Sequence, residues 1–183
     1  YRLSEEEVAR FSVNRHLYKG VSIQARLIRY YPFGQTGVHT VGYVGRIDAR
    51  ELQRIDPANY SATTHIGKIG IERSYEKELH GQVGYQQEEG NAQNRTLRII
   101  DPMPPIAGKN LYLNIDMKLQ AYADKVLGDY RGSIVAIDPR NGALLALVSK
   151  PNYDPNLFVT GISIKNYAAL RDSPDKPLFN RSI

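Results

Sequence analysis

Two serine–lysine pairs have the spacing of a nucleophile and an assisting amine. Lys77 follows Ser74 by three residues, and Lys176 follows Ser173 by three; on a helix this spacing places hydroxyl and amine on one face. Two glutamates flank Lys77 and favour its charged form, which opposes its use as a base. A proline follows Ser173 and disfavours the helical turn. We interpret both pairs as chance matches and keep a serine acyltransferase using Ser74 and Lys77 as an alternative.

No pattern in the sequence matches a metal site or a phosphate loop. The segment 67–70 has two glycines around a lysine but lacks the longer spacer and the Ser or Thr of a phosphate loop, so we interpret it as a turn. No two histidines stand at a metal-binding spacing. We therefore expect surface or hydrogen-bonding roles for all of them, and no cofactor or metal. The four are His16, His39, His65 and His80.

Composition limits the class of protein. The chain has 183 residues, is 42% hydrophobic and 23% charged, and carries a net charge of +5. It has no cysteine, which excludes disulfides, thiolate nucleophiles and cysteine-ligated zinc. Acidic residues interleave with the basic ones, as in 72–78, so we expect a mixed-charge surface and no nucleic-acid partner. A basic module that binds an anionic polymer stays open as an alternative.

Capping residues and apolar spacing predict the helices. Ser4 with Glu7 forms a capping box before a helix over 5–15. Asp48 is expected to cap a short helix that runs to residue 55, and Asp116 one that Gly128 ends. Two more helices are expected, over 71–80 from apolar residues four apart and over 164–170.

Alternation and turn residues predict the strands. We expect strands over 22–30 and 38–47, and a polar hairpin of 82–89 with 95–100 around the loop 90–94. A second hairpin, 133–137 with 143–149, consists of apolar runs and is expected to form buried core strands whose edges lack partners. The proline cluster at 101–105 predicts a domain hinge.

Four tyrosines, at 30, 31, 43 and 75, allow two interpretations. They could form an aromatic docking surface, or they could pack normally with their hydroxyls at the rim of the core. We favour ordinary packing.

The first hundred residues contain motifs that match a known family in order. These are Arg29 to Gly34 (RYYPFG), His39 to Gly45 (HTVGYVG), Gly67 to Glu76 (GKIGIERSYE) and Leu79 to Gly81 (LHG). They resemble the pedestal motifs of class B penicillin-binding proteins, and in particular of the elongation-type transpeptidases of Gram-negative rods.

The second half resembles the opening of the transpeptidase domain of the same family. The matching segments are 113–116 with 119–120, 132–139, 142–149 and 151–158. The resemblance implies an α+β chain. An elongated pedestal of short helices and antiparallel strands spans 1–105, truncated at its N-terminus, and an incomplete α/β transpeptidase segment of a helix plus an antiparallel hairpin spans 106–183. In the family, later strands complete the sheet of that hairpin.

Activity is implied for the parent protein only. The family cross-links peptidoglycan through a serine acyl-enzyme and is acylated by β-lactams, but its Ser-x-x-Lys nucleophile follows the segment that resembles 179–181, where this chain ends. We therefore expect this chain alone to be inactive and assign it no catalytic residue. The pedestal positions, which the resemblance marks as structural, are Arg29, Tyr31, Pro32, Gly34, His39, Gly42, Tyr43, Gly45, Gly67, Gly70, Glu72, Tyr75 and Gly81.

Partners and location also follow from the resemblance. It implies a periplasmic enzyme on the bacterial inner membrane, held by an N-terminal anchor that this chain lacks. Expected partners are peptidoglycan stem peptides for the parent protein, and an MreC-type scaffold and a RodA-type glycosyltransferase for the pedestal. Exposed apolar and aromatic surface is where we expect such partners to dock.

Overall fold

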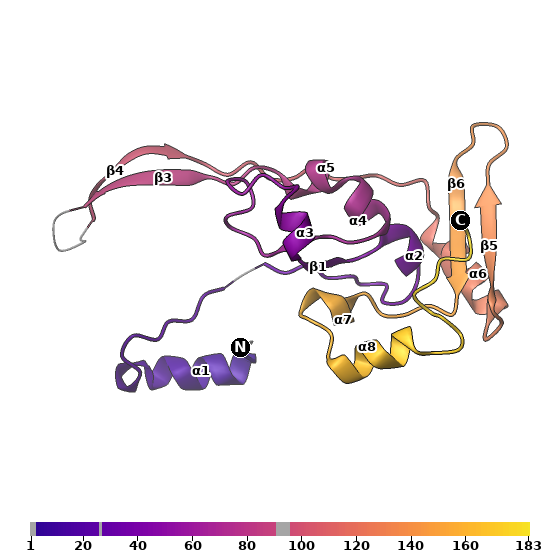
Figure 1. The fold of residues 1–183 in the computed structure, drawn as a ribbon, viewed down its shortest axis with the longest axis horizontal. Coiled ribbons are helices and arrows are strands. Elements are labelled where there is room, and N and C mark those ends of the chain that lie inside the picture. Colours follow the sequence, from indigo (N-terminus) through magenta and orange to yellow (C-terminus); the bar gives the residue numbers. More distant parts are fainter. Residues whose placement is uncertain (1–2, 26, 91–95) are drawn as a thin grey trace.

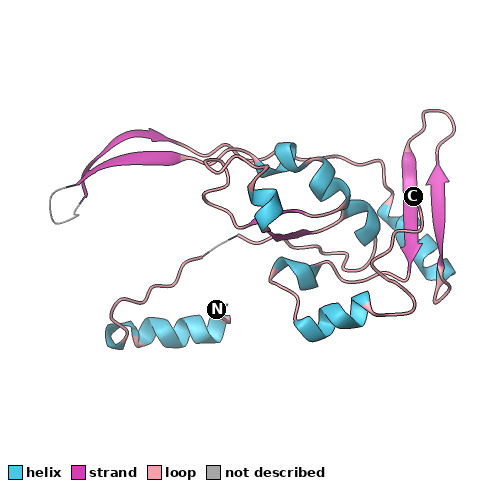
Figure 2. Ribbon diagram, in the orientation of Figure 1, coloured by secondary structure: helices cyan, strands magenta, loops and turns pink. Residues whose placement is uncertain are grey.

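The computed structural model describes residues 3–25, 27–90 and 96–183, and its strands form three separate two-stranded antiparallel sheets. The molecule is elongated, with the second sheet projecting at one end and the third at the other (Figure 1). Short helices lie along the chain between them (Figure 2). The α+β class with small antiparallel sheets is confirmed. The pairs are β1 (Val44–Arg46) with β2 (His65–Gly67), β3 (Tyr85–Gly90) with β4 (Thr96–Met103), and β5 (Gly132–Ile137) with β6 (Leu144–Lys150).

Helix α1 (Glu5–Val13) lies apart from the body of the molecule (Figure 1). Its capping box is present as predicted: the Ser4 hydroxyl accepts from the Glu7 N–H at 3.2 Å, and the Glu7 carboxylate accepts from the Ser4 N–H at 2.8 Å. A short 3-10 turn, η1 (Arg15–Leu17), follows. The strand predicted over 22–30 is wrong, because its described residues are extended but pair with no other strand.

The single strand predicted over 38–47 is also wrong. Its first half is one helical turn, α2 (Val38–Val41), and only its second half is β1. Gly37 and Gly42 flank that turn with φ of 76° and 82°, and this left-handed backbone, easily adopted only by glycine, interrupts an extended strand. The short helix after Asp48 is confirmed as α3 (Ala49–Leu52), shorter than predicted.

The helix predicted over 71–80 is divided at Tyr75 into α4 (Gly70–Ser74) and α5 (Glu76–His80). Glu76 accepts hydrogen bonds from the Gly67 N–H at 2.8 Å and from the Tyr60 hydroxyl at 2.9 Å. Both contacts are made by the first residue of α5, where the helix is divided, and the spacing of apolar residues does not indicate this division. Gly81 ends α5 as predicted, with φ of 75°.

The polar hairpin is confirmed as β3 and β4, with β4 extending to Met103. Its predicted loop, 90–94, lies largely outside the described residues. No described helix is long and apolar enough to cross a membrane.

Helix α6 (Met117–Leu127) packs on β6. Asp116 caps it and Gly128 ends it, as predicted. The Gln120 side chain, 1% exposed, binds both backbone groups of Leu147 at 2.8 Å and so occupies part of the open edge of β6. The expectation of two buried strands is wrong for β5, in which no residue is buried, because β6 is its one strand partner in the described chain and α6 packs mainly on β6.

The core lies where 151–178 folds back against α2 and β1. Tyr153 and Phe158 bury their rings against Val38, with Tyr43 packed beside them. Tyr43 and Phe158 stack with ring centroids 4.1 Å apart. Phe158 belongs to α7 (Asn156–Val159), which is followed by α8 (Ile164–Arg171), close to the predicted 164–170.

His39 is buried rather than at the surface, and of its two expected roles it keeps only the hydrogen-bonding one, toward the backbone of Pro151 and Pro177. It is 7% exposed, lies edge-on to Tyr153, and its Nε2 has no hydrogen bond within the described residues. Burial lowers the pKa of His39, and carbonyl groups of Pro151 and Pro177 offset this only in part.

We predict that Gly67→Ala destabilises the fold by about 1–3 kcal/mol. A Cβ at Gly67 would lie 2.1 Å from the Glu72 carbonyl oxygen, so the backbone itself would have to move. Gly132→Ala is the matched control, because its Cβ would meet only a side-chain atom of Leu127 at 3.8 Å. Urea unfolding measures both; equal stability of the two variants would contradict the close approach.

We predict that the melting temperature falls as pH decreases from 7.5 to 5.5. The unfolded chain protonates His39 near pH 6.5, whereas the folded chain does so only at lower pH because the pKa is lowered, so acid favours unfolding. His39→Gln should reduce this dependence, and His16→Gln, at an exposed site, should keep it. Thermal scans at both pH values test the prediction, which fails if His39→Gln retains the full dependence.

Candidate functional site

A buried carboxylate, Glu72 on α4, organises the centre of the molecule. It is 4% exposed, and the Arg29 guanidinium binds both of its oxygens, Nε to Oε1 at 2.8 Å and Nη2 to Oε2 at 3.0 Å. The Tyr31 hydroxyl donates to Oε1 at 3.1 Å. Because a buried charge is tolerated only when paired and hydrogen-bonded, these contacts hold the extended 29–31 segment against α4.

Tyr31 links this carboxylate to the first sheet. Its hydroxyl also accepts a hydrogen bond from the Val44 N–H at 2.9 Å. Burial, followed by the negative charge of Glu72, raises the pKa of Tyr31 well above its ordinary value. The phenol therefore stays protonated and serves as a donor to Glu72 and an acceptor from β1 at the same time.

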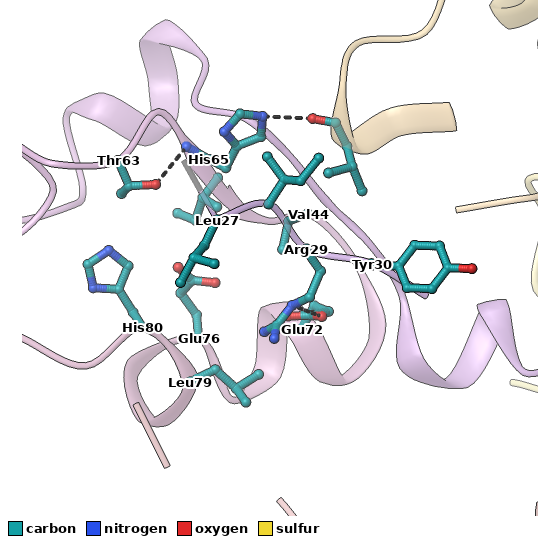
Figure 3. Close-up of a pocket in the computed structure, with 13 residues that line it drawn as sticks. Leu27, Arg29, Tyr30, Val44, Thr63, His65, Glu72, Glu76, Leu79 and His80 are labelled. Atoms are coloured by element: carbon teal, nitrogen blue, oxygen red, sulfur yellow. Dashed lines mark hydrogen bonds and ion pairs between the residues drawn. The ribbon is translucent and has the colours of Figure 1, made fainter. Parts of the chain in front are cut away.

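A groove of about 560 Å³ lies beside this network. In Figure 3, Arg29 points to Glu72 with Leu79 below them, His80 lies on the opposite side, and Tyr30 points away. Polar and apolar side chains share the lining, and no group of three or more metal-ligating side chains occurs among the described residues. Of its polar lining groups, Glu76 binds the Gly67 N–H and the Tyr60 hydroxyl, and the His65 ring binds the Val159 carbonyl oxygen, so these groups support the fold.

The predicted serine–lysine pairs do not form a catalytic arrangement. Ser74 ends α4 and Lys77 lies in α5, so the helix break at Tyr75 separates them, and both are exposed. The Ser173 hydroxyl accepts from the Asp175 N–H at 3.2 Å, in a turn rather than a helix. Both observations agree with the interpretation as chance matches.

The turn predicted over 67–70 is wrong at both ends, because Gly67 ends β2 and Gly70 begins α4, so that only residues 68–69 connect the two elements. Lys68 does not face a phosphate cradle, because its amine forms ion pairs with Glu51 and Asp48. Gly70 has φ of 61°, and a Cβ there would lie 2.6 Å from the Thr40 carbonyl oxygen. This glycine permits α2 and α4 to approach closely.

The structure brings most of the thirteen pedestal positions together around Glu72 and the core, and leaves a few at turns. Of the four tyrosines, Tyr31 and Tyr43 pack inside, whereas Tyr30 (72% exposed) and Tyr75 lie on the surface, so the four do not form one aromatic surface. The carboxylate network holds Arg29, Tyr31 and Glu72; the core holds His39 and Tyr43; β1, β2 and their helix junctions hold Gly42, Gly45, Gly67 and Gly70; turns, helix ends and the helix break hold Pro32, Gly34, Tyr75 and Gly81.

Two contacts to α7 were missed from the sequence. Asn156 binds the backbone of Tyr31, and the His65 ring binds the Val159 carbonyl oxygen at 2.8 Å. These pairs are 125 and 94 residues apart. Local patterns hold no sign of either, and only covariation between distant positions could reveal them.

Family comparisons match both parts of the chain. Residues 1–113 match the Penicillin-binding Protein dimerisation domain, and residues 132–180 match the penicillin-binding protein transpeptidase domain. Curated relatives include the peptidoglycan D,D-transpeptidases MrdA of Escherichia coli K12 (48% identical, 98% of this chain, 29% of the relative) and Acinetobacter baumannii (49%, 99% and 27%). The chain thus spans less than a third of their length.

Solved structures with the same fold include two PBP2 proteins. The Pseudomonas aeruginosa protein, in complex with WCK 5153, is 52% identical over 87% of this chain and 32% of that chain, with a TM-score of 0.76. The Helicobacter pylori protein, in complex with MreC, is 32% identical over 99% of this chain and 34% of that chain, with a TM-score of 0.90.

We predict that Tyr31→Phe lowers the free energy of unfolding by about 1–3 kcal/mol, because Glu72 loses a donor and the Val44 N–H loses its acceptor in a buried site. Tyr30→Phe removes a hydroxyl from the neighbouring exposed ring and should be close to neutral. Urea denaturation compares the two variants. A Tyr31→Phe protein as stable as the parent would contradict the role of this hydroxyl.

Proposed function

The chain belongs to the penicillin-binding protein family, and we propose that it is the pedestal and the first part of the transpeptidase domain of an elongation-type peptidoglycan D,D-transpeptidase. We place the boundary between the two parts at residue 105. The observation that carries this proposal is the common fold with PBP2 in its complex with MreC, which extends over nearly the whole chain. The dimerisation-domain match over 1–113 supports the same assignment.

The role of this chain is positional. The parent protein cross-links peptidoglycan stem peptides through a serine acyl-enzyme, and its penicillin sensitivity arises from acylation of the same serine. No Ser-x-x-Lys sequence other than the two interpreted as chance matches occurs in residues 1–183. This chain contributes the base on which the catalytic part is oriented, and the ion pair between exposed Arg29 and buried Glu72 holds that base together.

The pedestal docks proteins of the elongation machinery. An MreC-type scaffold is the first expected partner, and the Helicobacter pylori PBP2 of the same fold, which was solved bound to MreC, supports it. A RodA-type glycosyltransferase is the second. Both partners place the protein at the periplasmic face of the bacterial inner membrane, anchored through a segment outside this chain.

We predict that the chain binds the soluble domain of an MreC-type scaffold, and that binding persists when salt rises from 50 to 200 mM. A contact between protein surfaces depends less on released counterions than the binding of a polyanion does. Biolayer interferometry measures the affinity. An affinity that falls more than about tenfold over this range, together with binding to an anionic polymer, would favour the polymer-binding alternative.

We predict that fluorescent penicillin does not label this chain. The Ser74→Ala variant serves as the control, since Ser74 is the serine of the alternative enzyme. Gel fluorescence after incubation with the penicillin measures the label. Labelling that disappears in Ser74→Ala would establish the serine acyltransferase instead.

A further inference from the structure

The four-residue helix α7 is bound at both ends and in its middle by residues of the N-terminal part. At its start Asn156 contacts Tyr31, in its middle Phe158 stacks on Tyr43, and at its end the Val159 carbonyl oxygen contacts His65. We call these three contacts the α7 clamp. Its two hydrogen-bonded pairs join residues 125 and 94 positions apart.

The Asn156 amide pairs with the Tyr31 backbone as a neighbouring strand would. Its Oδ1 accepts from the Tyr31 N–H at 3.0 Å, and its Nδ2 donates to the Tyr31 carbonyl oxygen at 3.0 Å. The same Nδ2 donates to Asp154 Oδ1 at 2.8 Å, and that oxygen also accepts from the Asn156 N–H at 2.9 Å. These partners fix the orientation of the amide, because only the NH₂ side can face both Asp154 and a carbonyl.

The other two contacts, His65 with Val159 and Tyr43 with Phe158, restrict how α7 is oriented. A carbonyl oxygen only accepts, so His65 Nε2 must donate to Val159; His65 itself is held in β2. The stacked rings of Tyr43 and Phe158 are inclined by 25°. Contacts at the start, in the middle and at the end of one short helix restrict both its position and its rotation.

We propose that the α7 clamp sets the orientation of residues 151–183 relative to the N-terminal part, and that Asn156 is its positioning residue. Tyr31 joins the clamp to the Glu72 network, because its side chain binds Glu72 while its backbone binds Asn156. The network inside the N-terminal part and the placement of α7 therefore share one residue. The clamp stands on contacts within this chain, independently of the proposed partners.

Distance measurements between two spin labels test the clamp in the full chain. The chain has no cysteine, so Leu52→Cys on α3 and Ile164→Cys on α8, both exposed positions, are labelled alone. We expect one narrow distance distribution in the parent. Asn156→Ala should lose this narrow peak, and so should Asn156→Asp, which keeps an acceptor for the Tyr31 N–H but places a carboxylate beside Asp154 and the Tyr31 carbonyl.

Asn166→Ala is the matched control, because Asn166 is an exposed asparagine on α8. It should keep the narrow peak. A folded Asn156→Ala protein with the distribution of the parent overturns the proposal. So does a peak that broadens equally in Asn166→Ala, since the change would then not depend on the clamp.

Hydrogen exchange of the parent chain decides the question even when the Asn156 variants fail to fold. The Tyr31 amide is bound by the Asn156 side chain, so its exchange requires the clamp to open or the chain to unfold. We expect it to exchange at least about tenfold more slowly than the amides of the exposed residues 27–30. Equal rates would show an open clamp and overturn the proposal.

Discussion

The fold depends on the partners of one nearly buried carboxylate, Glu72. Removing a carboxylate from water costs several kcal/mol unless partners replace its hydration, and for Glu72 these are the Arg29 guanidinium and the Tyr31 hydroxyl. Both partners come from an extended segment that pairs with no strand in the described chain. The contacts with Glu72 thus hold this segment in place, as backbone hydrogen bonds hold a strand in place in a larger sheet.

The rest of the molecule is joined by the same kind of side-chain contact. Two-stranded sheets are marginal in water by themselves, and all three sheets of the described chain have two strands. Two of these sheets are supported by side chains that bind strand backbone, Gln120 on the edge of β6 and Glu76 on the Gly67 N–H of β2. Asn156 binds the backbone of Tyr31, which lies in no strand, in the same way. A common feature is a polar side chain that satisfies a backbone group which a third strand would otherwise pair.

Local features of this fold could be predicted from sequence, and long-range ones could not. The caps at Ser4 and Asp116 act within a few residues, so their patterns sufficed. Residues 38–41 alternate like a strand but form a helical turn because of the glycines on either side. The resemblance singled out Tyr31 and Glu72, yet the partner of the Tyr31 backbone lies 125 residues away, and the burial of His39 depends on Tyr153.

The contacts on α7 join residues far apart in the sequence, and this affects the order of folding. Contacts between distant residues close large loops and form late, and a chain made from its N-terminus exposes the early partners first. During synthesis, Tyr43 therefore lacks its partner Phe158 and His65 lacks Val159, and the aromatic ring of Tyr43 stays open to water. The His65–Val159 contact can form only after 94 further residues beyond His65 have been made. During this interval the nascent chain exposes apolar surface that can aggregate or bind a chaperone.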